Sequence, residues 1–190
     1  MKLASALLLV LVGVGHSMAL DLDDVLIAVQ GRVYRAQLTF DVAASVDQVT
    51  AVLTDYQHPD RLTPDVTKRE VVSQQSGITR VRTEIHSCAV LFCRDLTLTQ
   101  DVTVVAGTIQ ADTIPEESDF RSGYVLWTVT SNDNGGSHIQ FESVVEPKFF
   151  IPPLIGRYLI RKRLQQQIFA TAENLEREAA QNPVPLANQD

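Results

Sequence analysis

The chain has 190 residues, of which 45% are hydrophobic and 21% are charged, and its formal net charge at pH 7 is −7. This composition is typical of one globular domain and excludes intrinsic disorder, a collagen-like chain and a protein with several membrane spans. The acidic balance also argues against nucleic acid as a partner, because binding to a phosphate backbone requires clustered lysine and arginine.

The first nineteen residues have the three-part pattern of a secretory signal peptide. A positively charged start is followed by an apolar run from Leu3 to Val14, and Ser17 and Ala19 supply the small residues of a cleavage site. The run is shorter than the ~20 residues that span a bilayer, although a retained N-terminal anchor is the alternative. We therefore expect a signal peptide over 1–19, cleaved after Ala19, and a periplasmic or secreted protein.

A strand and a helix with clear patterns open the mature chain. Residues 23–29 are read as a short lead-in of helical character, whereas 33–42 alternates apolar and polar residues and predicts a strand. Ser45 and Gln48 match the capping box that begins a helix, and two prolines bracket a second short helical turn over 59–64. The first helix carries its apolar face on Val49, Val52, Leu53 and Tyr56.

The segment from 66 to 146 is almost wholly β in pattern. Glycine, proline and an Asn/Asp/Gly cluster divide it into short apolar runs. Short intervals between strands favour antiparallel hairpins, because parallel strands need long crossovers. The candidate strands are Thr67–Gln74, Ile78–Ser87, Arg94–Val105, Thr108–Ile114, Gly123–Ser131 and Ser137–Val145.

The two cysteines, Cys88 and Cys93, lie in this β-rich segment. In an exported protein a single pair is most simply a disulfide, and a tight hairpin would place the two residues opposite each other. Free thiols and a redox-active pair are the alternatives, although redox pairs usually have C-x-x-C spacing. Two thiolates are too few for a structural zinc site, and no histidines show metal spacing, so we expect a disulfide, no metal and no cofactor.

The C-terminal part predicts one long helix. From about residue 154 to 181 the chain has no proline and is rich in good helix formers. Its expected core stripe is Leu164, Ile168, Thr171, Leu175 and Ala179. Residues 183–190 contain two prolines and are expected to form a flexible tail.

The order of these elements resembles the helix-grip fold of the START/polyketide cyclase-like (SRPBCC) superfamily. The likeness is carried by 40–49, by 52–56 with 64–66, by the strand around Trp127, and by 145–156. It is closest to the cyclase/dehydrase branch, which includes coenzyme Q-binding proteins. The resemblance implies an α+β domain over 20–182, in which a curved antiparallel β-sheet wraps around the long C-terminal helix and two short helices follow the first strand.

The resemblance also implies a hydrophobic cavity between the sheet and the C-terminal helix. We expect an exported carrier or sensor whose ligand is a lipid, a quinone or an isoprenoid. Arg82 and Glu84 are the expected polar anchors, since such pockets are mostly apolar with few polar groups. The expected apolar and aromatic lining is Val49, Val52, Leu53, Tyr56, Tyr124, Trp127, Phe141, Phe150, Ile151, Leu154 and Ile155.

One strand offers an alternative function. Alternation along 78–87 places Arg80, Arg82, Glu84 and His86 on a single face. The four groups are either the solvated face of a half-buried sheet or an acid–base row, in which case the protein is a cyclase or dehydratase using Glu84, His86 or Glu142. An envelope protein-interaction module is a further alternative, and no other catalytic signature is present, so no catalytic residue is assigned.

An apolar run before the long helix adjoins the densest basic cluster. The run covers 149–155, and Arg157, Arg161 and Lys162 follow it. Basic residues beside apolar ones are typical of contact with a membrane interface, although internal salt bridges are the alternative. We therefore expect a monomer whose partners are a hydrophobic small molecule or lipid and a membrane surface.

Overall fold

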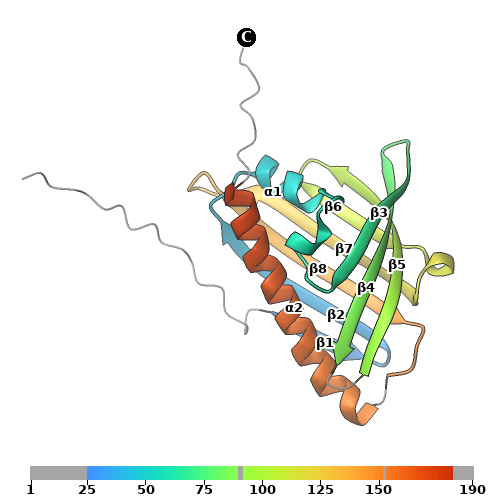
Figure 1. The fold of residues 1–190 in the computed structure, drawn as a ribbon. Coiled ribbons are helices and arrows are strands. Elements are labelled where there is room, and N and C mark those ends of the chain that lie inside the picture. The colour runs from blue at the N-terminus through green and yellow to red at the C-terminus, as the bar shows by residue number, and fades with distance from the viewer. Residues whose placement is uncertain (1–24, 90–91, 152, 182–190) are drawn as a thin grey trace, which may run out of the picture.

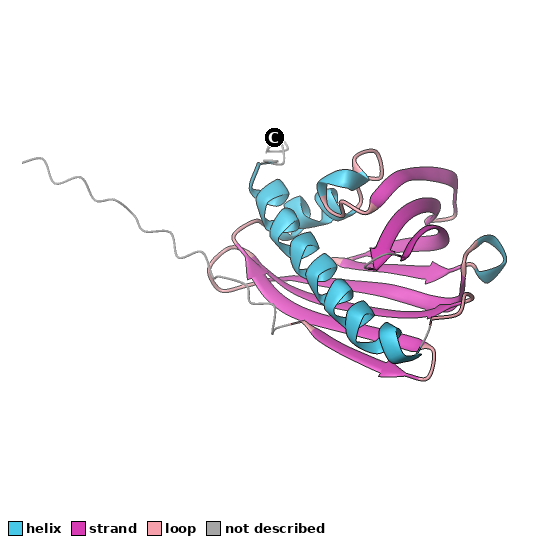
Figure 2. Cartoon of the chain, turned by 60° about the horizontal axis from the view of Figure 1, so that its bottom comes forward, coloured by secondary structure: helices cyan, strands magenta, loops and turns pink. Residues whose placement is uncertain are grey.

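One curved antiparallel sheet carries a long helix across one of its faces (Figures 1 and 2). The computed structural model describes residues 25–89, 92–151 and 153–181, so the expected signal peptide (1–19) and tail (183–190) lie outside it. Within the described residues, eight strands follow the spatial order β1-β2-β8-β7-β6-β5-β4-β3. The elements are β1 (Leu26–Gln30), β2 (Val33–Val42), α1 (Val46–Leu53), η2 (Pro59–Arg61), β3 (Val66–Gln75), β4 (Ile78–Ala89), β5 (Phe92–Val105), β6 (Thr108–Thr113), η3 (Pro115–Glu117), β7 (Phe120–Ser131), β8 (Ser137–Pro147) and α2 (Pro153–Gln181).

The predicted helix-grip α+β fold is confirmed. Each strand expected between 66 and 146 is present, and its neighbours pair with it antiparallel. The ends differ from the expected ones by up to three residues, as at β7, which begins at Phe120 rather than at Gly123. The lead-in differs in type, because β1 is a strand that pairs with β2.

Two local signals fix the start of the domain. Gly31 has a φ of 61° in the turn between β1 and β2, which a glycine adopts without steric cost. The predicted capping box is formed, since the Gln48 amide donates to the Ser45 hydroxyl and the Ser45 amide donates to the Gln48 side chain. These bonds satisfy amide groups that the first turn of α1 leaves without helical partners.

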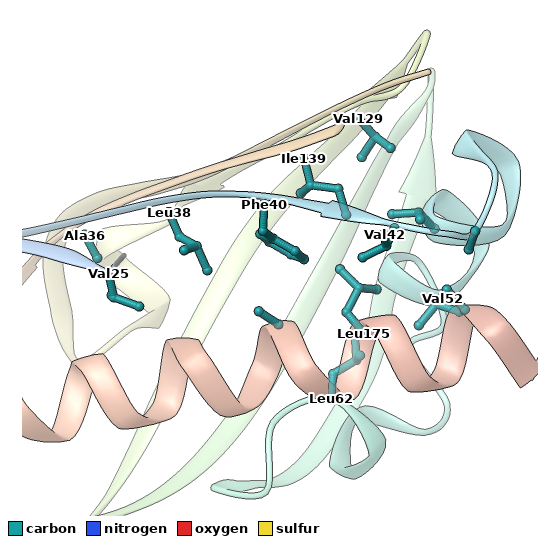
Figure 3. Close-up of a cluster of buried hydrophobic side chains, with 14 of the residues drawn as sticks. Val25, Ala36, Leu38, Phe40, Val42, Val52, Leu62, Val129, Ile139 and Leu175 are labelled. Carbon is teal, nitrogen blue, oxygen red and sulfur yellow. The ribbon is translucent and has the colours of Figure 1, made fainter. Parts of the chain in front are cut away.

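The helices define an inner and an outer face of the sheet. Even-numbered residues of β2 point inward and are buried against α2, whereas the odd-numbered ones are exposed or partly exposed. The inner residues join Leu175 of α2 in the larger of two hydrophobic clusters (Figure 3). Its β2 members are Ala36, Leu38, Phe40 and Val42, and its α2 members are Ala172, Leu175 and Ala179.

The second cluster lies farther along the same face. It consists of Val81, Val102 and Ile109, which come from β4, β5 and β6. Leu53 and Trp127 pack against both clusters, so they connect the two halves of the inner face. Among the described helices, none is long and apolar enough to cross a membrane.

Candidate functional site

The inner face of β5 to β8 carries apolar side chains that α2 covers only in part. The main contacts of α2 are with α1, β1, β2 and β4, at the two sides of the sheet. Strand register places the remaining inner-face residues between these contacts. Partly buried apolar residues in this central region are Leu96, Leu98, Ala111, Val125, Trp127, Phe141 and Val145.

Trp127 and Phe141 form the aromatic centre of this region. They are direct cross-strand partners on β7 and β8, with ring centroids 4.5 Å apart and planes tilted by 49°. Such a pair adds about 0.5–1.5 kcal/mol beyond the burial of its area. Both residues were expected to line the ligand cavity, and both lie on the inner face.

The expected residues of α1 divide into two groups. Val49 and Val52 are buried in the larger cluster, where they join α1 to the sheet and α2. Leu53 and Tyr56 are only partly buried and pack against the second cluster. The first pair therefore belongs to the solid core, whereas the second pair borders the half-covered region.

Arg69 is a charged group on this apolar face that the sequence patterns did not single out. A bulge between Val66 and Lys68 shifts the alternation of β3, so that Arg69 faces inward opposite Thr83. Its Nε donates to the Thr83 hydroxyl at 3.3 Å. Among the described residues, no carboxylate forms an ion pair with Arg69.

Burial changes the ionisation of Arg69 and its aromatic neighbour. Burial lowers the pKa of Arg69, and the proximity of Tyr56 opposes that shift. Burial raises the pKa of Tyr56, with the positive charge of Arg69 acting the other way. In the described part of the chain, the Thr113 hydroxyl on β6 is also buried without a hydrogen-bond partner. The inner face thus holds three polar groups, Arg69, Tyr56 and Thr113, in a largely apolar setting.

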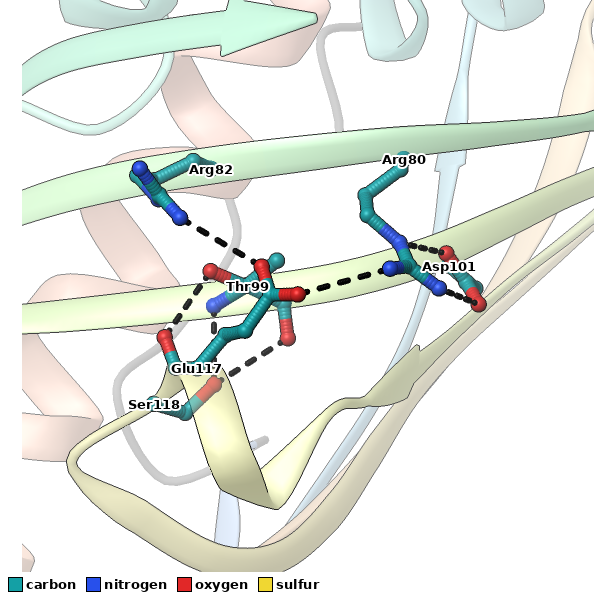
Figure 4. A network of polar contacts seen from close by, with 6 residues as sticks. All are labelled: Arg80, Arg82, Thr99, Asp101, Glu117 and Ser118. Atoms are coloured by element: carbon teal, nitrogen blue, oxygen red, sulfur yellow. Dashed lines mark hydrogen bonds and ion pairs between the residues drawn. The ribbon is translucent and has the colours of Figure 1, made fainter. Parts of the chain in front are cut away.

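The row Arg80, Arg82, Glu84 and His86 lies on the outer face of β4, away from α2. Arg80 forms two bonds to Asp101, at 2.8 and 3.0 Å, and Arg82 reaches Glu117 at 3.3 Å (Figure 4). The bond from Arg80 lowers the pKa of Asp101. The structure therefore places the two expected anchors, Arg82 and Glu84, on the far side of the sheet from the half-covered apolar region.

Tyr124 and Glu142 also lie on the outer face. The Tyr124 hydroxyl donates a short bond to Glu142, which Gln37 and Arg35 contact as well. The bond from Tyr124 is the main cause of a lowered pKa at Glu142. An open hollow of about 480 Å³ adjoins this network, and polar and apolar residues line it in nearly equal number: Gln37, Thr39, Thr128, Gln140 and Glu142 with Leu26, Leu38, Leu126 and Phe141.

The expected mouth is described only in part. Phe150 is 72% exposed and Ile151 is partly buried. The side chains of Leu154, Ile155 and Arg157 lie outside the described residues, although their backbone belongs to α2.

The basic residues near the start of α2 differ in whether they have a bonding partner. Arg161 and Lys162 are exposed, and among the described residues neither has an ion-pair partner. Arg163 instead donates from Nη2 to both carboxylate oxygens of Asp65, each at 2.8 Å. Arg163, the next residue along the helix, is therefore paired within the fold, whereas Arg161 and Lys162 face solvent.

The end of the β4–β5 hairpin lies beside the 149–151 segment. Cys88 and Cys93 form the predicted disulfide across this hairpin. The guanidinium of Arg94 stacks over the Phe149 ring at 4.9 Å from its centroid. Arg94 of β5 therefore joins this end of the hairpin to the segment that precedes α2.

Comparison with known proteins gives a family match over most of the chain. A family model described as polyketide cyclase / dehydrase and lipid transport matches residues 34–180. A search of curated protein sequences found no match.

Several solved structures share the fold. The Zhui aromatase/cyclase from Streptomyces sp. R1128 is 16% identical with a TM-score of 0.64, over 78% of this chain and 94% of that chain. A STAR-related lipid transfer protein from Xanthomonas axonopodis is 17% identical with a TM-score of 0.62, over 86% of this chain and 98% of that chain. A START superfamily protein from Mycobacterium smegmatis is 15% identical with a TM-score of 0.62, over 77% and 97%. At these identities the likeness shows a common fold.

Proposed function

Because the chain belongs to the polyketide cyclase/dehydrase and lipid transport family, we propose that it is an exported carrier or sensor of a hydrophobic ligand. The ligand is a lipid, quinone or isoprenoid held between α2 and the inner face of β5–β8. The observation that carries this proposal is the set of partly buried apolar side chains around Trp127 and Phe141. Covering that area with an apolar ligand would contribute roughly 25 cal/mol per Å² removed from water.

The polar groups of the inner face suggest the chemistry of the ligand's head. Arg69 supplies a positive charge that no described carboxylate neutralises, and Tyr56 and Thr113 supply hydroxyl groups. An anionic or carbonyl oxygen would satisfy these donors, while the apolar remainder packs against Trp127. Arg69 therefore takes the anchoring role in our proposal that the sequence suggested for Arg82 and Glu84.

The enzymatic alternative receives less support from the geometry. Glu84 and His86 on β4, and Glu142 on β8, are on the outer face, so a ligand beneath α2 does not meet them. Each of the three also has a partner there: Lys68, Asp95 and Tyr124, respectively.

The ligand is tested by extracting natively purified protein with organic solvent and analysing the extract by mass spectrometry. We expect one lipid, quinone or isoprenoid species in near-stoichiometric amount. Trp127 is the only tryptophan of the chain, so adding that species back to stripped protein should change the intrinsic fluorescence saturably. Arg69→Gln should weaken binding of an anion-headed ligand, whereas the outer-face control Arg80→Gln should not. A protein that carries no apolar species, and whose fluorescence no such species changes, would refute the proposal.

The carrier role requires access to a membrane, and the region around Phe150 and the start of α2 exposes aromatic and basic side chains. Phe150 and Tyr158 are 72% and 71% exposed, and Tyr158 lies one helical turn before Arg161 and Lys162, which form no ion pair within the described residues. Aromatic groups with adjacent cations bind the interface of anionic bilayers. We expect sedimentation with vesicles containing phosphatidylglycerol and weaker sedimentation with pure phosphatidylcholine. Phe150→Ser should reduce sedimentation with the anionic vesicles, whereas the control Leu26→Ser, at an exposed apolar residue of β1, should not. An equal loss of sedimentation in both variants would contradict docking through this edge.

Export and monomeric state complete the proposal. The Cys88–Cys93 disulfide supports an oxidising compartment. N-terminal sequencing of the protein from its native host should find Leu20 as the first residue, and sedimentation equilibrium should give the mass of one mature chain. An intact Met1 in the cytoplasmic fraction would contradict export.

A further inference from the structure

The outer face at the end of the β4–β5 hairpin brings together four residues with metal-binding chemistry. Strand register pairs His86 with Asp95 and Cys88 with Cys93. Residues two apart on a strand share a face, so the two cross-strand pairs are consecutive on one side of the hairpin. The H-x-C spacing on β4 supplies only two metal-binding side chains, and β5 adds the second cysteine and the aspartate.

The distances within this cluster are short. Cys88 Sγ lies 3.4 Å from His86 Nε2, and His86 Nδ1 lies 2.6 Å from Asp95 Oδ1. The two sulfur atoms and a ring nitrogen of His86 all lie within 4.8 Å of one another. His86 and Cys93 are exposed and Cys88 is partly buried, so an ion can reach the cluster from solvent.

This arrangement offers ligands for a soft metal ion, together with a carboxylate that orients one of them. Thiolate sulfur and imidazole nitrogen are the ligands that Zn²⁺ and Cu⁺ prefer. Metal-binding histidines commonly donate their other ring nitrogen to a carboxylate, which fixes the orientation of the ring. In this cluster the carboxylate is Asp95, which contacts Nδ1 of His86. The other ring nitrogen, Nε2, is then directed at the sulfur atoms.

We propose that the hairpin end is a redox-gated site for a thiophilic d¹⁰ cation, with Cys88 Sγ, Cys93 Sγ and His86 Nε2 as ligands. In the disulfide state the sulfur atoms are bonded to each other and cannot serve as thiolates. A dithiol reductant donates two electrons and two protons, the S–S bond breaks, and the reductant becomes a disulfide. Binding of the cation then releases the two thiol protons, and the fourth coordination position stays open to solvent.

The charges around the cluster favour a cation. The Asp95 side chain is 90% exposed, and Glu84 precedes His86 on the same face of β4. The nearest basic residue in sequence, Arg94, faces the opposite side of the hairpin and stacks on Phe149. Lys68 approaches Glu84 at 3.9 Å but forms its shorter bond, at 2.8 Å, with Glu70.

The site is tested with Co²⁺ as a spectroscopic probe and Zn²⁺ as competitor, using the full chain. A phosphine reduces the disulfide, taking the oxygen of one water molecule and leaving two thiols. The reduced protein should bind one Co²⁺ with a thiolate-to-metal charge-transfer band, and Zn²⁺ should displace it. The oxidised protein should show no such band.

Two variants separate a built site from a bare dithiol. Asp95→Asn should weaken binding about 10- to 100-fold, as is usual when the carboxylate that orients a metal-binding histidine is removed, and His86→Ala should weaken it at least as much. His138→Ala is the matched control, because His138 Nδ1 bonds Asp41 at 2.7 Å on the same face of the sheet, far from any cysteine. Absence of metal binding by the folded reduced protein, or equal affinity in His86→Ala and His138→Ala, would overturn the proposal.

Discussion

Replacing Arg69 by methionine should stabilise the protein while it weakens ligand binding. Arg69 points into an apolar face, donates one bond to Thr83 at 3.3 Å, and has no ion-pair partner among the described residues. Burial disfavours its charged form, as the lowered pKa of the guanidinium indicates. Such a group destabilises the empty protein, since several kcal/mol of hydration are lost without a compensating charge.

The size of the effect follows from opposing contributions. Removing the guanidinium recovers a desolvation cost of roughly 2–4 kcal/mol, because the group is mostly but not fully buried. It also loses one hydrogen bond, which contributes about 1 kcal/mol. Methionine keeps a similar volume and adds apolar contact, so the free energy of unfolding should rise by about 1–3 kcal/mol.

Urea denaturation followed by circular dichroism measures this change, and fluorescence titration measures ligand binding. The matched control is Arg80→Met, which removes an arginine that Asp101 and Glu117 neutralise on the outer face. The control should leave stability unchanged or slightly lower, and it should not affect binding. If Arg69→Met destabilises the chain, or binds an anion-headed ligand as tightly as the wild type, the reasoning about Arg69 is refuted.

Three further predictions concern the core, the first helix and the outer face. Leu175→Ala removes a side chain with no exposed surface and should cost about 2–5 kcal/mol in thermal or urea unfolding, whereas Leu26→Ala at an exposed position should change stability by less than about 0.5 kcal/mol. Ser45→Ala breaks the capping box and should cost about 1 kcal/mol by the same assay; no change would contradict the role of the cap. The lowered pKa of Glu142 implies that its contribution is present above the ordinary value of 4.5 and is lost as pH falls through the folded pKa. The loss of stability on acidification below pH 4.5 should therefore be smaller in Glu142→Gln than in the wild type.

Periodicity in the sequence was sufficient for the strands β2 to β8, the long helix and the disulfide hairpin. The alternation along β4 correctly placed Arg80, Arg82, Glu84 and His86 on one face. It could not decide which face, because that depends on where α1 and α2 pack, and those contacts are long-range. The anchors suggested by the sequence therefore lie on the outer face, opposite the half-covered apolar region.

Three features depend on more than the alternation along a single strand. Arg69 faces inward only because of the bulge in β3, which changes the parity of the strand by one residue. The cluster of His86, Cys88, Cys93 and Asp95 depends on the register of β4 against β5. The first strand was missed because its burial pattern is set by α2, which covers Val25 and Ile27 from far along the chain.

The bulges of β3 also protect an open edge of the sheet. β3 is the last strand in the spatial order, so within the described part of the chain no strand pairs with its free edge. Unpaired edge strands can recruit other chains and aggregate, and bulges and charged side chains oppose this. The register shifts after Val66 and Val71, together with Lys68 and Glu70, interrupt the edge at two points. The bulge that turns Arg69 inward thus also interrupts the edge of the sheet at which a second copy of the chain would otherwise be able to pair.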